Sequence, residues 1–293
     1  RRCAFSEAQG ASIRVSESDG ESTSPKSLPE YLTQHQDIVL VGLEGGEVVY
    51  QGRSFYRIDY GYAELSLLGL IETPPGCPSI SSEKGSKEAL RLMRVRHSRN
   101  FPANTLFRAI TDGVLLPFKP EVLICDDLGT ECADFVAADI SNRKIAFVHA
   151  KADNNKSVSA SAFHEVVAQA MKNLAYLSRN GEVPSGASSW TRSAKWNQTS
   201  VPRLMKPLPR GIPDGRALWA ALKSRIIDAS NAELWVVLAT SGCCDLDCLQ
   251  KAVTDPKART PETAQVLHLF DGLNGYARQL GVKLKIYDAP KSV

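Results

Sequence analysis

Three residues with chemically useful side chains fall on two neighbouring stretches that the sequence predicts to be strands. The segments ECADFVAADI (131–140) and KIAFVHAKA (144–152) are apolar and of strand length, and the turn SNR between them is short enough for a hairpin. His149 and Lys151 are two residues apart, so their side chains point to the same face of a strand. Pairing of the two strands then places Asp134 about opposite the Lys151 end.

This set of side chains suits one kind of chemistry. A lysine is costly to bury unless its charge is needed. Metal-dependent hydrolysis of a phosphodiester needs carboxylates that hold Mg²⁺ or Mn²⁺, and a cationic group that orients and activates the attacking water. Asp134 and Lys151 would supply one group of each kind at a single edge of a sheet.

The elements that must position these residues follow an α/β pattern. The sequence predicts helices over 103–115, 162–179, 214–229 and 261–281, and strands over 121–127, 131–140, 144–152, 233–241 and 282–289. The first three strands are joined by short turns and pair as hairpins, whereas the later strands return through helices. We therefore expect an α/β fold with a mixed central sheet flanked by helices.

The rest of the chain is expected to form smaller parts. Residues 1–27 are rich in Ser, Glu, Asp and Gly and predict a flexible tail or linker. Residues 28–100 predict a small β-rich unit followed by a basic helix that Ser82 caps, with Leu90, Leu92, Met93 and Val95 as its apolar contacts. Residues 101–293 form the main domain, with a basic loop insertion over 180–213. A chain that starts at Arg1 rather than Met is expected to be a piece of a longer protein.

The order helix, three strands, helix, strand over 103–241 resembles the core of the PD-(D/E)xK nuclease superfamily, the restriction-endonuclease-like fold. The motif of that family is an Asp at the start of the second core strand, then an acidic residue, any residue and Lys on the third. Asp134 matches the Asp and Lys151 matches the Lys, while Ala133 replaces the Pro of the family name. His149 stands in the acidic position, and an imidazole is a poor ligand for Mg²⁺. Either the second carboxylate comes from elsewhere, or the metal preference moves toward Mn²⁺.

The resemblance implies further site residues around this motif. The candidate carboxylates are Glu131 at the mouth of the hairpin, Asp126 and Asp127 at the end of the preceding strand, Glu165 in the following helix, and Glu83 before the sheet. Members of the family often carry a Gln in the following helix, and Gln169 lies four residues from Glu165 on one helical face. The predicted catalytic residues are therefore Asp134, His149, Lys151, Glu131 and Gln169, and the predicted metal ligands are Asp134, Glu131, Asp127 and Glu165. Lys151 would orient water and stabilise charge at the scissile phosphate.

Basic stretches over 87–99 and 190–210 are either solvated faces or a nucleic-acid surface. The second stretch contains Trp190 and Trp196, and cations beside aromatic rings would bind phosphates and stack on bases. The predicted contact residues are Arg94, Arg96, Lys172, Arg192, Lys195, Arg203 and Lys206.

Composition narrows the class of protein. The 293 residues are 43% hydrophobic and 23% charged, as in ordinary globular proteins, and no run of 18 apolar residues predicts a membrane span. The net charge of +3 does not by itself indicate nucleic acid. Seven cysteines, an odd number, predict reduced thiols and a cytoplasmic location. The cluster GCCDLDC (242–248) lacks a second ligand pair for zinc and predicts a helix start with partly buried thiols.

These observations favour a metal-dependent nuclease that acts on nucleic acid, DNA rather than RNA. Its expected setting is a bacterial defence or repair system, in which other domains, partner subunits or a second copy assist recognition. The alternative is a catalytically degenerate nuclease fold that binds nucleic acid or a partner protein. A nucleotide-binding enzyme is disfavoured, because the chain has no GxGxxG or GxxxxGK[ST] loop.

Overall fold

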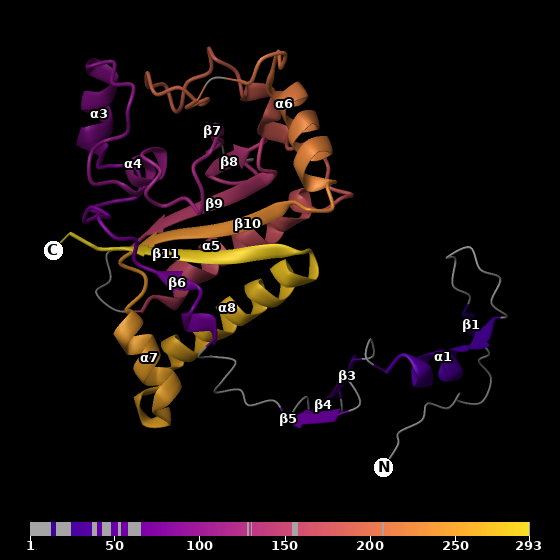
Figure 1. Ribbon diagram of the computed structural model, residues 1–293. Helices are drawn as coiled ribbons and strands as arrows, with labels where there is room; N and C mark the ends of the chain where they lie inside the picture. Colours follow the sequence, from indigo (N-terminus) through magenta and orange to yellow (C-terminus); the bar gives the residue numbers. More distant parts are fainter. Residues whose placement is uncertain are drawn as a thin grey trace. The chain divides into compact units, whose positions relative to one another are not determined.

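The computed structural model describes residues 13–15, 25–36, 40–42, 48–51, 54–57, 66–127, 129, 131–153, 158–206 and 208–292 (Figure 1). The chain divides into two units, residues 1–63 and residues 64–293. Within the described residues, no helix is long and apolar enough to cross a membrane.

The first unit contains short antiparallel pairings and one helix. Its elements are β1 (Arg14–Val15), β2 (Lys26–Ser27), α1 (Leu28–Gln34), β3 (Leu40–Gly42), β4 (Val48–Gln51) and β5 (Ser54–Arg57). Strand β1 pairs with β2, and β4 pairs with both β3 and β5. Most of the tail predicted over 1–27 lies outside the described residues.

The second unit is built on a six-stranded mixed sheet with the order β6-β11-β10-β9-β8-β7. The strands are β6 (Ile71–Glu72), β7 (Val122–Cys125), β8 (Phe135–Asp139), β9 (Lys144–Ala152), β10 (Glu233–Ser241) and β11 (Val282–Ala289). Strands β7, β8 and β9 form an antiparallel meander, and β9, β10, β11 and β6 run parallel. The predicted mixed sheet is confirmed.

Helices cover both faces of this sheet (Figure 1). They are α3 (Lys87–Val95), α4 (Leu106–Thr111), α5 (Ala160–Asn173), α6 (Gly215–Leu222), α7 (Leu246–Thr254) and α8 (Pro261–Gln279), with 3₁₀ turns at Leu174–Leu177, Ser185–Ser189 and Pro256–Ala258 and a π-helical turn at Lys223–Ile227. Ile145 and Phe147 of β9 enter the core that α5 and α8 share. Ala146 and Val148 enter the core beneath α4, because successive side chains of a strand point to opposite faces.

Helix α3 begins later than predicted. Its cap is Ser86, whose hydroxyl accepts the N–H of Ala89 at 3.1 Å, and the expectation that Ser82 caps it was wrong. Gly85, with φ of +115°, turns the chain between the two serines. The carbonyl of Ser82 instead accepts the N–H of Leu106 at 3.1 Å. The predicted apolar contact of Val95 was also wrong, because this side chain is 67% exposed.

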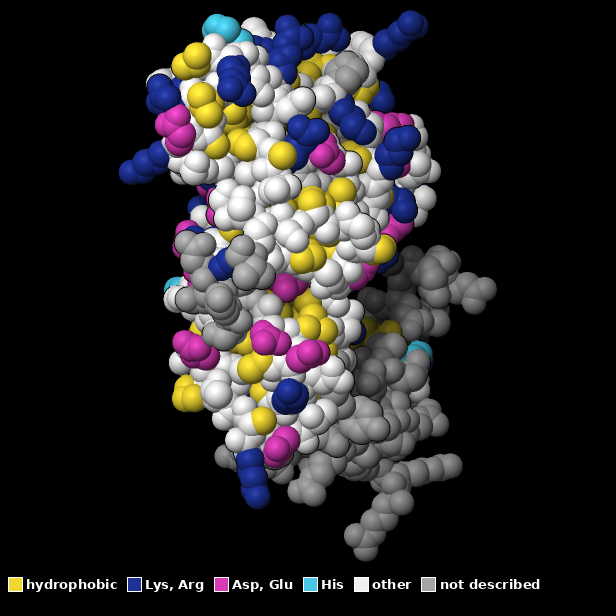
Figure 2. Space-filling model, turned by 90° about the vertical axis from the view of Figure 1, so that its left-hand side faces the viewer, with side chains coloured by type: hydrophobic (Ala, Val, Ile, Leu, Met, Phe, Trp, Pro, Cys, Tyr) yellow, Lys and Arg dark blue, Asp and Glu magenta, His cyan; other side chains and the backbone are white. Residues whose placement is uncertain are grey.

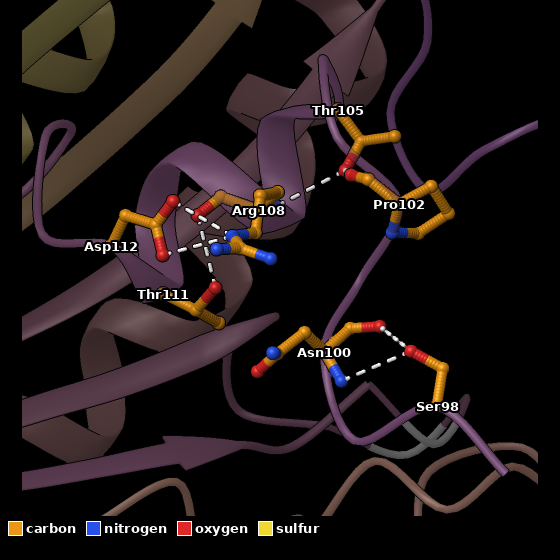
Figure 3. Close-up of polar contacts among 7 residues, drawn as sticks. All are labelled: Ser98, Asn100, Pro102, Thr105, Arg108, Thr111 and Asp112. Atoms are coloured by element: carbon orange, nitrogen blue, oxygen red, sulfur yellow. Dashed lines mark hydrogen bonds and ion pairs between the residues drawn. The ribbon is translucent and has the colours of Figure 1, made fainter. Parts of the chain in front are cut away.

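Helix α4 is held at both ends by its own side chains (Figure 3). Thr105 is the N-cap and accepts the N–H of Arg108 at 3.1 Å, while its hydroxyl donates to the carbonyl of Pro102. Arg108 in turn pairs with Asp112 one turn later at 2.7 Å. The start of α4 is therefore a firm anchor for the loop that precedes α3.

Residues 64–100, which we expected to form part of the N-terminal unit, belong to the second unit. Strand β6 extends the main sheet through the pair Ile71 and Ile286. Ile80 and Met93 are buried in the core beneath α4. The expected boundary near residue 100 was wrong, because these apolar side chains find their partners in the large sheet.

Candidate functional site

Asp134 lies at the point where β8 begins, beside the end of β9. The register pairs Phe135 with Val148, and the Asp134 Oδ2 atom accepts the backbone N–H of Ala150 at 2.8 Å. The side chain thus continues the hydrogen-bond ladder past the end of the strand, and it is 7% exposed. Burial raises the pKa of Asp134 to about 7, against the opposing effects of the Ala150 N–H and of Lys84. The carboxyl group therefore takes up or releases a proton near neutral pH.

Lys84, which the sequence analysis did not single out, is paired with acidic residues near Asp134. The Lys84 Nζ atom is 3.1 Å from Asp127 Oδ2 and 3.2 Å from Glu83 Oε1. It also lies 5.0 Å from the centre of the Phe107 ring. Burial lowers the pKa of Lys84, but the carboxylates of Asp127, Glu83 and Asp134 outweigh it and raise that pKa above its ordinary value. Lys84 is therefore a charged ammonium among three acids.

Lys151 lies at the same end of the sheet and pairs with Glu165 of α5. The two side chains are 24% and 58% exposed, so this pair is open to solvent. Burial lowers the pKa of Lys151, yet the carboxylates of Glu165 and Glu83 raise it overall. The structure thus places Asp127 and Glu83 around Lys84, and Glu165 beside Lys151. Asp134 bonds to Ala150, the residue before Lys151.

His149 lies one side-chain step inward from Lys151 and is buried. The residue is 1% exposed, and its Nε2 atom has no hydrogen-bond partner among the described residues. Burial, reinforced by the charge of Lys172, lowers the pKa of His149 to about 3. A neutral imidazole inside the core does not reach solvent at the end of β9, which corrects the prediction that His149 is a catalytic residue.

Glu131 lies in the loop before β8, and Gln169 lies on α5 one turn beyond Glu165, as expected. Glu131 lines an open pocket of about 640 Å³ at the C-terminal end of α5, together with Lys172. Its backbone carbonyl accepts the side-chain N–H of Asn173 at 3.3 Å. Gln169 is half-buried one turn beyond Glu165 on α5. The grouping of Glu131 with Asp134 at one metal stays a prediction.

The tryptophans of the basic loop are core residues, so the prediction that they stack on bases was wrong. Trp190 and Trp196 are 0% and 2% exposed. The Trp190 Nε1 atom donates to Asp126 Oδ1 at 2.6 Å, and the Trp196 Nε1 atom donates to Asp127 Oδ2 at 2.8 Å. Each indole thus satisfies an acid at the end of β7, because a buried carboxylate needs hydrogen-bond donors.

Two predicted nucleic-acid contacts bond to backbone carbonyls beside β7, and one of them, Arg203, is buried. Arg203 is 6% exposed, and its Nη1 atom donates to the carbonyls of Cys125 and Asp127 at 3.3 and 3.4 Å. The Lys206 ammonium donates to the carbonyl of Pro120. These bonds hold the loop against β7. The burial of Arg203 corrects the expectation that it binds phosphates, whereas the contact predicted for the half-buried Lys206 stays a prediction.

The other predicted cations lie at the surface. They are Arg94, Arg96, Lys172, Arg192 and Lys195. Arg94 bridges α3 to the basic loop by donating to the carbonyl of Asn197 at 3.5 Å. Figure 2 shows Lys and Arg side chains gathered at the upper end of the molecule, the end at which α3 lies in Figure 1.

The described residues contain no group of three or more His, Cys, Asp or Glu side chains that could hold a metal ion. The candidate carboxylates near Lys84 already have partners. One oxygen of Asp134 and one of Asp127 each accept an N–H. The Lys84 ammonium contacts Asp127 and Glu83. As they stand, the predicted ligands do not fit Mg²⁺ or Mn²⁺. The segment 242–248 is the start of α7 capped by Asp245, and the six cysteines in the described part of the chain are free thiols.

Comparison with known proteins does not assign this chain to a family. No protein-family model, no curated protein and no solved structure matches this chain.

Proposed function

We propose that this chain is a nuclease of the restriction-endonuclease-like class, which hydrolyses phosphodiester bonds of nucleic acid. The observation that carries the proposal is that Asp134 accepts the N–H of Ala150, the residue before Lys151, so both motif residues belong to one end of the β8–β9 pair. They come from β8 and β9 of an antiparallel meander whose third strand pairs in parallel with β10. The resemblance of the sequence implied this same order of elements and this same pair of residues.

The side chains suggest how hydrolysis would proceed. Lys151, partly open to solvent, would leave Glu165 and bind a non-bridging oxygen of the scissile phosphate, where negative charge builds up in the transition state. Asp134, with a pKa of about 7, would accept the proton of the attacking water. The water oxygen would form a bond to phosphorus as the bond to the leaving sugar oxygen breaks.

The substrate and the setting follow from the charge pattern and from the resemblance. The exposed cations of α3 and of the basic loop over 190–210 would bind the phosphates of the substrate. We expect this substrate to be DNA rather than RNA. The expected setting is a cytoplasmic bacterial defence or repair system, in which other subunits or a second copy assist. A requirement for Mg²⁺ or Mn²⁺ stays a prediction, and no step above depends on it.

A cleavage assay with the full chain tests this proposal. Plasmid DNA and RNA are incubated with the wild type, with Lys151→Ala and with Lys144→Ala, each in Mg²⁺, in Mn²⁺ and in EDTA. Lys144 is the matched control, because it lies on the same strand at the opposite end and pairs with Glu233. We expect Lys151→Ala to lose about 100-fold or more in rate and Lys144→Ala to cleave like the wild type. Equal rates for all three proteins would refute the assignment.

A second function, a nucleic-acid or partner-binding module on a degenerate nuclease fold, is favoured by one observation. The acidic position of the motif holds His149, which is buried, and a lysine lies among the remaining acids. Binding of DNA without cleavage in any of the three conditions would support this module.

A further inference from the structure

We infer that the end of α3 and the basic loop form one cationic surface, which binds the phosphate backbone of double-stranded DNA in preference to single-stranded DNA. The inference deepens the proposed function and rests on it for the choice of DNA as the polyanion. The cations that define this surface are Arg94, Arg96, Arg99, Arg192 and Lys195.

Positive charge is concentrated in two stretches of the chain that contain no acids. Residues 89–111 and 183–213 together hold ten Lys and Arg and no Asp or Glu. The whole chain has 35 Lys and Arg and 32 Asp and Glu, so the rest of the protein carries a net negative charge. The small overall charge therefore conceals a strong separation of charge, which would direct a polyanion to these two stretches.

The cations of the surface are available to a ligand. All five are exposed, and none has a carboxylate partner among the residues that the structure describes. By contrast, Arg91 and Arg108 of the same stretch pair with Glu88 and Asp112. Cations that lie near one another without acids repel each other, and phosphates would relieve this repulsion.

The two stretches are fastened to each other, so the surface exists before any ligand binds. Arg94 of α3 donates to the carbonyl of Asn197 at 3.5 Å. Phe101, which follows α3, packs edge-on against Trp196 with ring centres 5.0 Å apart. The Trp196 indole in turn donates to Asp127 at 2.8 Å, which fixes the loop to the end of β7. A preformed surface loses less conformational entropy on binding than a mobile one.

The surface lacks the aromatic rings that favour single strands. The aromatic residues of the two stretches are Phe101, Phe107, Trp190 and Trp196, and each is at most 2% exposed. Proteins that bind single strands gain much of their affinity from bases stacked on exposed rings. The bases of a duplex are already stacked on each other, and its backbone has the higher charge density, so cations alone suffice to bind it.

Fluorescence anisotropy of a labelled DNA tests the inference without any cleavage. The probes are a duplex of about 25 base pairs and one of its strands alone, each in EDTA at about 50 mM and about 200 mM salt. The proteins are the full-length wild type, a triple variant of the surface (Arg94→Ala, Arg96→Ala and Lys195→Ala) and a control. The control removes the same charge from α7, the turn after it and α8, by changing the exposed Lys251, Lys257 and Arg278 to Ala. Melting curves confirm that each variant is folded.

We expect the wild type to bind the duplex at least about tenfold more tightly than the single strand at the lower salt concentration. Five phosphate contacts predict that the affinity for the duplex falls about 500-fold between the two salt concentrations. In the triple variant of the surface, two contacts remain and the fall should be about tenfold, whereas the control should behave like the wild type.

Three results would overturn the inference. They are equal or tighter binding of the single strand by the wild type, no binding of the duplex, and a salt dependence that the triple variant of the surface shares with the wild type. The two proposals fail separately. Duplex binding through this surface without cleavage in any metal keeps the surface and refutes the nuclease. Cleavage that depends on Lys151, by a protein that prefers the single strand, keeps the nuclease and refutes the role of the surface.

Discussion

The burial of His149 predicts a specific dependence of stability on pH. Its pKa is lowered to about 3 in the folded chain, mainly by burial, whereas an ordinary histidine has a pKa of about 6.5. As the pH falls below about 6.5, the unfolded chain binds a proton that the folded chain does not bind until about pH 3. The stability contributed by neutral His149 is therefore fully present above pH 6.5 and is lost as the pH falls toward 3.

The size of this loss follows from the difference in pKa. Each pH unit within this window costs about 1.4 kcal/mol, so the wild type should lose about 2 kcal/mol between pH 7.5 and pH 5 through this residue. Asp134 and Asp288 act in the opposite direction, since burial raises the pKa of each to about 7. Their folded forms keep protons that the unfolded chain releases above about pH 3.9, so folding gains from them as the pH falls. A single pH profile therefore mixes terms of both signs.

Comparison with His149→Leu separates the histidine from the two aspartates. Urea unfolding, followed by tryptophan fluorescence at pH 7.5 and pH 5, gives the free energy of unfolding for each protein. The loss on going to pH 5 should be about 2 kcal/mol greater in the wild type than in His149→Leu. His268→Gln, at an exposed position of α8, is the control. Equal pH dependence of the wild type and His149→Leu would refute the claim that the folded chain keeps this imidazole neutral.

Three further predictions test the packing around the site, each by the free energy of urea unfolding at pH 7.5. Trp190→Phe removes the 2.6 Å donor to the buried carboxyl of Asp126 and should cost about 1–3 kcal/mol; an unchanged stability would mean that this bond is not formed. Gly272→Ala should stabilise α8 by about 0.5–1 kcal/mol, because an added Cβ meets open space, whereas Gly215→Ala should destabilise the chain by more than about 1 kcal/mol because its Cβ would overlap a backbone carbonyl. The reverse order of these two glycine variants would contradict the packing described. Ser86→Ala removes the cap of α3 and should cost about 1 kcal/mol, and no loss would argue against Ser86 as the cap.

Much of the fold could be predicted because its signals are local. Three expected strands, over 144–152, 233–241 and 282–289, occur with the same bounds, since each is a run of strand length that is apolar or alternates apolar with polar residues. The two preceding strands are shorter than expected, because the chain leaves the ladder at their polar ends. The pairing of Lys151 with Glu165 also follows from local order, because α5 returns along β9 directly after it.

Only the tertiary structure decided which polar groups meet across the fold. His149 and Lys151 share a face of one strand, yet one is buried and the other is partly open, because only the end of β9 reaches solvent. The sequence predicted Trp190 at a surface that binds nucleic acid, whereas in the structure its indole N–H donates to the buried Asp126.

Lys84 is the clearest case of what the sequence by itself could not decide. In the sequence it is one charge in a polar stretch before a helix, and nothing local distinguishes it from its neighbours. Its ion pair is with Asp127, a residue far along the chain, whose Oδ2 atom lies 3.1 Å from the Lys84 Nζ atom. The sequence determined the strands, their order and the meeting of Asp134 with the Lys151 end, because periodicity and short turns are local. The tertiary structure decided where the charges are neutralised, because that depends on distances between elements that no local pattern records.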